Sequence, residues 1–322
     1  WKRRRFLFRI WRKRKQIKPV HIRMANVPKD AILVFATMRN EMARLPHFLA
    51  HYRALGVDHF LIVDNGSDDG TTAYLAEQPD VSVWQTGQSY RLARFGMDWV
   101  GWLQWSYGHG HWCLTVDADE LLIYPDHDAK DLKDLTSWLD DRGIPSMGAL
   151  MLELYPKGPL QDVQYTPGDD PTDVLCWYDA DNYSQRYHPY YGNLWIQGGV
   201  RRRVFFEQEP ERAPTLSKTP LVRWDRRFAY VSSTHQILPR YLHDVFDPEG
   251  QSKVTGVLLH TKFLPLIAEK SAEELTRQQH FQNSAAYTAY HQQLAENPNL
   301  WHAEAQRYEG AAKLIAQGLM SK

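Results

Sequence analysis

Short apolar runs alternate with helix-forming segments along residues 31–116, and this alternation constrains the fold more than any other feature of the chain. Four runs have the length and composition of buried strands: Ala31–Thr37, His59–Val63, Val81–Gln85 and His111–Val116. The segments between them have the character of helices: Glu41–Leu55, Thr71–Glu77 and Leu92–Tyr107. Alternating strands and helices predict parallel strands joined by helical crossovers. We therefore expect an α/β protein with a doubly wound, mostly parallel sheet and helices on both faces.

The pattern loosens after Leu121. Residues Lys130–Asp140 predict a helix, and four further strands are expected at Gly148–Tyr155, Val200–Phe206, Leu221–Trp224 and Val254–His260. From Leu264 onward helix formers dominate, so we expect C-terminal helices. These features divide the chain into an N-terminal segment (1–29), a main domain (30–262) with halves at 30–125 and 126–262, and a C-terminal extension (263–322).

The first 18 residues carry ten Lys or Arg and no acid, which leaves 28 basic against 38 acidic residues in the rest of the chain. On a helix, Leu7, Ile10, Trp11 and Ile17 fall on one side among basic residues. That pattern favours a helix lying in the headgroup layer of an anionic membrane. A disordered basic tail and a docking arm for another protein are the alternatives. We expect no nucleic-acid partner, because no reading motif follows and the remainder is acidic.

Two cysteines, Cys113 and Cys176, are too few for a disulfide framework, and no run of about 18 apolar residues exists to span a bilayer. We therefore expect a cytoplasmic protein that lies peripherally on the inner face of the cytoplasmic membrane.

Polar residues follow three of the predicted strands, at the sheet edge where open α/β folds bind ligands. The fourth strand ends in Asp117 and Asp119, which share one face if the chain stays extended. Two carboxylates held together favour a divalent ion with oxygen ligands, Mg²⁺ or Mn²⁺, which can neutralise a diphosphate.

Two segments, RNEMARLPHFLAHYRALGVDHFLIVDNGSDDGT and WCLTVDADELLIYP, resemble the first half of family 2-like glycosyltransferases with the GT-A fold. Later pieces, GGVRRRVF, KTPLVRW, STHQI and LLHTKFL, resemble the second half of a bacterial branch of that group. The resemblance covers residues 31–264. It implies transfer of a sugar from a nucleotide-diphosphate donor, with UDP-sugars favoured, to a glycan or lipid-linked acceptor. Residues 30–125 would bind the donor and residues 126–262 the acceptor.

The resemblance also implies roles for individual residues. Asp117 and Asp119 match the D-x-D motif, and His260 matches a late histidine that completes the metal or diphosphate contacts. The donor would be contacted by Thr37, Arg39, Glu41, Asp64, Asn65, Asp117 and Lys262. Asn65 departs from relatives that carry a second Asp there, which puts a base-reading role in doubt. Equally, Asp64 and its neighbours are typical of a loop that caps a helix.

An inverting transfer needs a base near the acceptor hydroxyl, whereas a retaining one does not. The candidates are Asp181, Asp225, His235 and Glu153. Seven aromatic residues between 177 and 195 indicate an acceptor site, because a Tyr offers a stacking face and a hydroxyl. They are Trp177, Tyr178, Tyr183, Tyr187, Tyr190, Tyr191 and Trp195. The alternative is an aromatic cluster that packs the second half onto the sheet.

Two other functions remain open. A nucleotidyltransferase also pairs carboxylates and a metal on an α/β sheet, but it typically needs a glycine-rich loop after the first strand, where this chain has Thr37–Glu41 without glycine. A non-catalytic module that binds nucleotide sugars is the second.

Overall fold

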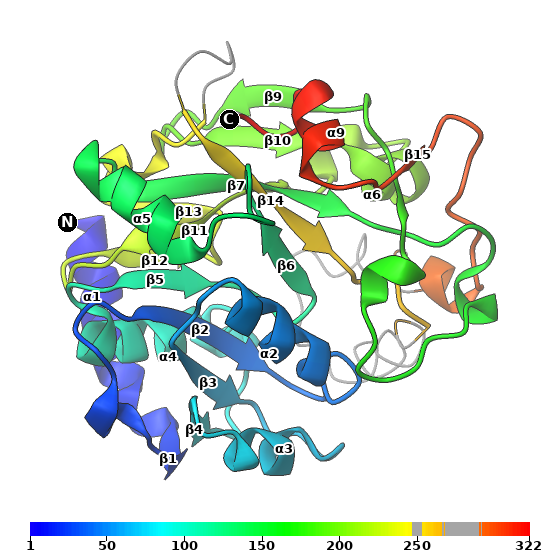
Figure 1. Ribbon diagram of the computed structural model, residues 1–322. Helices are drawn as coiled ribbons and strands as arrows, with labels where there is room; N and C mark the ends of the chain where they lie inside the picture. Colours follow the sequence, from blue (N-terminus) through cyan, green and yellow to red (C-terminus); the bar gives the residue numbers. More distant parts are fainter. Residues whose placement is uncertain (247–252, 266, 268–289, 291) are drawn as a thin grey trace.

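A nine-stranded mixed sheet runs through the protein (Figure 1). The structure is a computed structural model, and it describes residues 1–246, 253–265, 267, 290 and 292–322. The strands lie in the order β1 (Lys18–His21), β4 (Val81–Gln85), β3 (His59–Asp64), β2 (Ile32–Met38), β5 (Trp112–Thr115), β11 (Ser217–Arg223), β7 (Ser146–Glu153), β14 (Thr255–His260) and β6 (Glu120–Ile123). Six of them, β2, β3, β4, β5, β7 and β14, point the same way, while β1, β6 and β11 run opposite. The predicted α/β class with a mostly parallel sheet is confirmed.

Both faces of the sheet are covered, as the apolar runs predicted. On β2, Ile32 and Val34 belong to one buried cluster, while Leu33 and Phe35 belong to the other. The first cluster includes α2 (Leu45–Ala54), α3 (Thr71–Glu77) and α5 (Leu132–Asp141); the second includes α4 (Met97–Leu103). Because successive side chains point to opposite faces, a strand buried on both sides is a continuous apolar run.

Some boundaries differ from the predictions. Helix α2 begins at Leu45, later than expected, with Pro46 in its first turn, where the missing N–H costs nothing. The long helix expected at Leu92–Tyr107 is α4 followed by a π-helical turn at Gln104–Gly108.

The strand predicted at Val200–Phe206 is wrong: this segment is helix α6 (Gly199–Phe205). The β-branched and aromatic residues Val200, Val204, Phe205 and Phe206 suit a strand, but tertiary contacts decide otherwise. Gly199 adopts the left-handed conformation at φ +69°, and the Arg201 N–H donates to the buried Glu153 carboxylate, which caps the new helix.

Three two-stranded pairs surround the main sheet. They are β9 (Ser184–Tyr187) with β10 (Leu194–Gln197), β12 (Ala229–Ser232) with β13 (Gln236–Leu238), and β8 (Trp177–Tyr178) with β15 (Gln306–Arg307). Of the predicted C-terminal helices, α9 (Ala311–Ala316) is observed, whereas residues 268–289 lie outside the described part of the chain.

The N-terminal segment packs on the main domain. Helix α1 (Lys2–Lys13) lies beside α4, β1 extends the sheet antiparallel to β4, and Ile17 belongs to the buried cluster of α4. Among the described helices, none is long and apolar enough to cross a membrane.

Candidate active site

One edge of the sheet gathers the charged residues that the sequence singled out. The strands β2, β5, β7 and β14 all end there, and β11, which runs opposite, begins there. In the registered pairing of β7, β14 and β6, Glu153, His260 and Glu120 form a row across three adjacent strands. The sheet therefore brings together residues that are up to 140 positions apart in the sequence.

His260 lies between two carboxylates. Its Nε2 is 3.3 Å from Asp119 Oδ2, and its Nδ1 is 3.6 Å from Glu153 Oε1. Burial opposes protonation of His260, but the two carboxylates outweigh it and raise its pKa above 6.5. Burial likewise works to raise the pKa of Asp119, yet His260 and the charges of Arg44 and Lys262 hold that pKa well below its usual range. Asp119 and His260, both predicted as metal ligands, thus lie side by side, and metal binding by them stays a prediction.

Glu153 is buried and also pairs with Arg201 of α6. Burial works to raise the pKa of Glu153, but Arg201 and His260 overcome it and lower the pKa. A charge chain of Asp119, His260, Glu153 and Arg201 results. Its open end is Asp119, whose side chain is 23% exposed, whereas that of Glu153 is fully covered.

Asp117 does not share a face with Asp119, so this expectation is wrong. The chain turns between them, because the Glu120 N–H donates to the Asp117 carbonyl and the Glu120 carboxylate accepts from the Asp117 N–H. The Asp117 carboxylate instead lies 3.3 Å from Nζ of Lys218, a buried lysine that also pairs with Glu120. Burial alone would lower the pKa of Lys218, but the charges of Glu120 and Asp117 outweigh burial, so the pKa of Lys218 is raised. The sequence analysis missed Lys218.

Asp64 and Asn65 point into the protein. The fully buried Asp64 carboxylate accepts hydrogen bonds from Ser67, from Thr72 Oγ1 at 2.9 Å and from Gln85 Nε2 at 3.3 Å. Asn65 Nδ2 donates to the carbonyls of Thr86 and Gln88, each at 3.0 Å. These contacts give both residues a loop-organising role, which is the alternative noted from the sequence, and their contact with a donor stays a prediction.

Arg44 joins two of the residues predicted to contact the donor, Glu41 and Lys262. It pairs with Glu41 at 2.9 Å and donates to the carbonyls of Thr261 and Lys262, each at 3.3 Å. The predicted donor residue Arg39 donates to the carbonyls of Asn65 and Gly66. Arg44 is buried, and the sequence analysis missed it because its partners just after β14 are more than 200 residues away.

A narrow pocket opens at the ends of β2 and β5. Its polar lining is Thr37, Thr115, Asp117, Ser233 and Thr234. The buried hydroxyls of Thr37 and Thr234 have no hydrogen-bond partner among the described residues, whereas the Thr115 hydroxyl accepts from Gln104 Nε2 at 2.8 Å. Buried polar atoms without partners are uncommon in native proteins, so this pocket has unused capacity to bind a polar ligand.

The four base candidates lie in different places. Asp181 is exposed. Asp225 pairs with Arg227. It lies beyond the opposite end of β5, since Arg223 of β11, two residues before it, is in register with Trp112, the first residue of β5. Glu153 is committed to Arg201 and His260.

His235 lies near this edge, with Nδ1 2.8 Å from the Ser217 carbonyl oxygen. Burial, and after it the charge of Lys218, lowers the pKa of His235 to about 3. Such a ring is neutral but weakly basic at neutral pH.

The predicted acceptor aromatics fall into two groups. His188 brings Tyr191 and Trp195 together on the β9–β10 turn, with ring centroids 5.2 and 5.6 Å from its own. Tyr187 is exposed at the end of β9. Trp177 packs instead on Trp301, and the Tyr183 hydroxyl donates to the Asp179 carbonyl. Only part of the cluster is therefore available as one surface.

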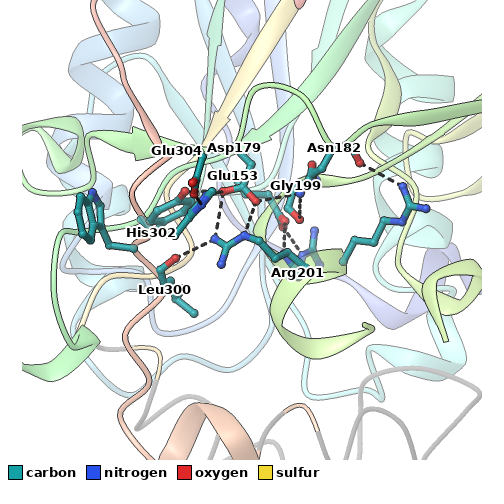
Figure 2. A network of polar contacts seen from close by, with 12 residues as sticks. Glu153, Asp179, Asn182, Gly199, Arg201, Leu300, His302 and Glu304 are labelled. Atoms are coloured by element: carbon teal, nitrogen blue, oxygen red, sulfur yellow. Dashed lines mark hydrogen bonds and ion pairs between the residues drawn. The ribbon is translucent and has the colours of Figure 1, made fainter. Parts of the chain in front are cut away.

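Figure 2 shows a second carboxylate network, centred on Asp179, which the sequence analysis missed in favour of Asp181. The buried Asp179 carboxylate accepts from the Tyr155 hydroxyl, from Arg203 at 2.8 and 3.1 Å, and from Asn182 at 2.9 Å. His302 Nε2 lies 3.2 Å away, and its Nδ1 faces Glu304. These partners tie β7, α6 and the C-terminal segment together.

No family model matches this chain, and no curated protein matches it. Solved structures give distant overlaps. One is 4-diphosphocytidyl-2C-methyl-D-erythritol synthase, at 17% identity over 44% of this chain and 66% of that chain, with a TM-score of 0.26. Another is an apo UDP-glucose pyrophosphorylase, at 12% identity over 77% and 99%, with a TM-score of 0.31. A third is UDP-glucose pyrophosphorylase from Acinetobacter baumanii, at 10% identity over 83% and 99%, with a TM-score of 0.32. Overlaps this distant carry no argument about activity, and the fold class rests on the sheet itself.

Proposed function

We propose that this chain transfers a sugar from a nucleotide-diphosphate donor to an acceptor hydroxyl, with a divalent ion, Mn²⁺ or Mg²⁺, held by Asp119 and His260. The observation that carries the proposal is the pair Asp119–His260, backed by Glu153, at the ligand-binding edge of an α/β sheet.

The residues fit such an ion. Neighbouring ligands of an octahedral ion with bonds of about 2.1 Å lie about 3 Å apart, close to the observed 3.3 Å between Asp119 Oδ2 and His260 Nε2. A histidine that binds metal through one nitrogen usually donates its other N–H to a carboxylate, and Nδ1 faces Glu153. No cluster of three or more His, Cys, Asp or Glu side chains that could hold a metal is present among the described residues. Two protein ligands plus substrate phosphates are a common arrangement for Mg²⁺.

Each residue then has a chemical task. When bound, the ion neutralises the donor diphosphate and stabilises it as a leaving group. Glu153, 3.6 Å from His260 Nδ1, is proposed to orient the ring by charge, although Nδ1 has no hydrogen-bond partner among the described residues. Arg201 compensates the charge of Glu153. Lys218 holds Asp117 and Glu120 in place without an ion. Lys262, whose charge acts on Asp119, would meet a phosphate oxygen under this proposal.

The acceptor is proposed to be a glycan or a lipid-linked glycan. The aromatic residues that support it are Tyr187, which is exposed, and Trp195, which is partly exposed, on the β9–β10 pair; Tyr191, in the turn between them, is buried. Tyr and Trp combine an apolar face for the C–H side of a sugar with a polar group for its hydroxyls.

Transfer of a nucleotidyl group is the second candidate, since an ion at Asp119 and His260 could serve it as well. The UDP-glucose pyrophosphorylases named above belong to that class, but overlaps at TM-scores of 0.31 and 0.32 decide neither way. The β2–α2 loop, without glycine, counts against this candidate because it offers no cradle of backbone N–H groups for phosphates.

Product analysis separates the candidates. The purified chain is incubated with UDP-, GDP-, CMP- or dTDP-sugars, Mn²⁺ and an acceptor panel, and the released products are separated by ion-exchange chromatography. We expect release of a nucleoside diphosphate, or of CMP from a CMP-sugar. With a sugar 1-phosphate and a nucleoside triphosphate supplied instead, release of pyrophosphate would identify a nucleotidyltransferase. Donor binding without either product across the panel would identify a binding module.

A further inference from the structure

Helix α1 is held in one rotational setting by contacts on its inner side. Ile10 is buried against α4, where a Cβ on Gly101 would come within 2.7 Å of Ile10 Cδ1. Arg9 pairs at 2.7 Å with the fully buried Asp98. Just beyond the helix, Gln16 accepts from Trp99 Nε1 at 3.0 Å. The prediction that Ile10 and Ile17 face a membrane is therefore wrong, because both are buried in the protein.

The opposite side of α1 is exposed and has a distinct composition. We define the outer face of α1 as the exposed residues that recur every three or four positions and share one side: Trp1, Arg4, Arg5, Phe8, Trp11, Arg12 and Lys15. Phe8 and Trp11 stack with centroids 5.8 Å apart, and both are at least half exposed. Exposed aromatic rings among cations and without acids are unusual on a monomeric surface, where large apolar groups cost free energy in water.

A second element continues this face. Lys2 Nζ lies 4.3 Å from the ring centroid of Tyr190 and 4.5 Å from that of Tyr191, on the β9–β10 turn. Tyr190 is 52% exposed, and Arg240 stacks over it at 5.0 Å. Tyr241, next to Arg240, is 58% exposed. The combined surface joins the N-terminal segment to residues of the 126–262 half.

We propose that the outer face of α1, together with Tyr190 and Tyr241, binds the surface of an anionic lipid bilayer. Trp and Tyr rings prefer the headgroup layer, where their apolar body is covered and their polar tip stays hydrated. Lys and Arg beside them interact with anionic headgroups. Phe8 and Trp11 enter the boundary between headgroups and acyl chains, while Ile10 and Ile17 remain in the protein core. This proposal does not depend on the proposed enzymatic activity.

The test is flotation of the full chain with vesicles of phosphatidylcholine and phosphatidylglycerol, compared with vesicles of phosphatidylcholine alone. The chain is expected to float with the anionic vesicles and to be released by salt, because screening weakens the attraction. Arg4→Gln with Arg5→Gln lowers the partition coefficient about 25-fold, at about fivefold per charge. Phe8→Ser with Trp11→Ser lowers it at least about tenfold.

Helix α5 supplies the matched control. Trp138 is 37% exposed on the other side of the sheet, and Arg142 stacks over it at 4.0 Å, as Arg14 does over Trp11 at 4.1 Å. Trp138→Ser with Arg142→Gln should leave flotation unchanged. Circular dichroism and thermal midpoints establish that every variant is folded. Failure of the full chain to bind anionic vesicles at low salt overturns the proposal, as does equal loss of binding in the α5 control.

Discussion

The carboxylate networks around Asp119 and Asp179 both pair an aspartate with a histidine and an arginine-bearing neighbourhood, but they differ in how fully the aspartate is bonded. Around Asp179, whose side chain is 1% exposed, Tyr155, Arg203, Asn182 and His302 all reach the carboxylate. Asp119 is 23% exposed, and its carboxylate is in contact with His260.

This difference distinguishes a structural network from one that can bind. A carboxylate has room for about four hydrogen bonds, and at Asp179 they are used by the protein itself. At Asp119 and in the neighbouring threonine pocket, capacity is left over. Residue type alone therefore does not distinguish the two networks; the bonding capacity left at the edge of the sheet does.

The largest effect is expected from breaking the Asp179 network. Asp179→Ala leaves the buried Tyr155 hydroxyl and the partly buried Arg203, whose side chain is 28% exposed, without their shared partner. Loss of one member of a buried charged network costs about 3–5 kcal/mol of unfolding free energy. Urea unfolding followed by tryptophan fluorescence measures it. Asp181→Ala, two residues away and exposed, is the control and should stay within about 0.5 kcal/mol. Similar, small losses in both variants would contradict the structural role of Asp179.

A medium effect is expected from pH, because two histidines near the Asp119 edge have opposite pKa shifts. The pKa of His235 is lowered to about 3, so the unfolded state binds a proton more readily and stability falls as pH drops below 6.5. For this partly exposed ring the loss is about 1–2 kcal/mol at pH 5. The pKa of His260 is raised, so its contribution is present below pH 6.5 and is lost as pH rises through its folded value.

Urea midpoints between pH 5 and pH 9, measured with a metal chelator present, test both signs. His235→Gln should reduce the slope of the acid side, to which His51 and His243 also contribute because burial lowers the pKa of each to about 4, and leave the alkaline side unchanged. His260→Gln should do the reverse. An unchanged acid side in His235→Gln would show that another group is responsible.

A smaller effect is expected in the narrow pocket. Thr37→Val removes a buried hydroxyl without a partner among the described residues, so stability should rise by up to about 1 kcal/mol. Donor affinity should fall up to about tenfold if that hydroxyl binds the donor. Thr115→Val is the matched control in the same pocket: its hydroxyl bonds Gln104, so this variant should lose about 1–3 kcal/mol of stability. Thermal midpoints and donor titration report both quantities, and a loss of stability in Thr37→Val would contradict the reasoning.

The sequence predicted the features that depend on local pattern. The apolar runs at β2, β3, β4 and β5 located the strands, and the D-x-D motif located the edge of the sheet that carries Asp119. It did not predict contacts between distant residues. Lys218 is 98 positions from Glu120, and His302 is 123 from Asp179, so no local period reveals either pair. Helix α6 was mistaken for a strand for the same reason, since Glu153 caps it from 48 residues away. On α1, the spacing of the apolar residues predicted a helix, but the packing of Ile10 against Gly101 decides which side is buried.

The most direct test of the central claim is Mn²⁺-dependent donor binding in the wild-type chain and in Asp119→Ala. Isothermal titration with a panel of nucleotide sugars, with Mn²⁺ or with a chelator, gives the affinities. We expect one donor class to bind tightly only with Mn²⁺, and Asp119→Ala to weaken that binding at least about tenfold, the lower range for loss of a metal-site residue. The fold should survive, because the Asp119 carbonyl still accepts from the Thr261 N–H at 2.7 Å. Equal Mn²⁺-dependent binding in a folded Asp119→Ala variant would contradict the assignment of this site.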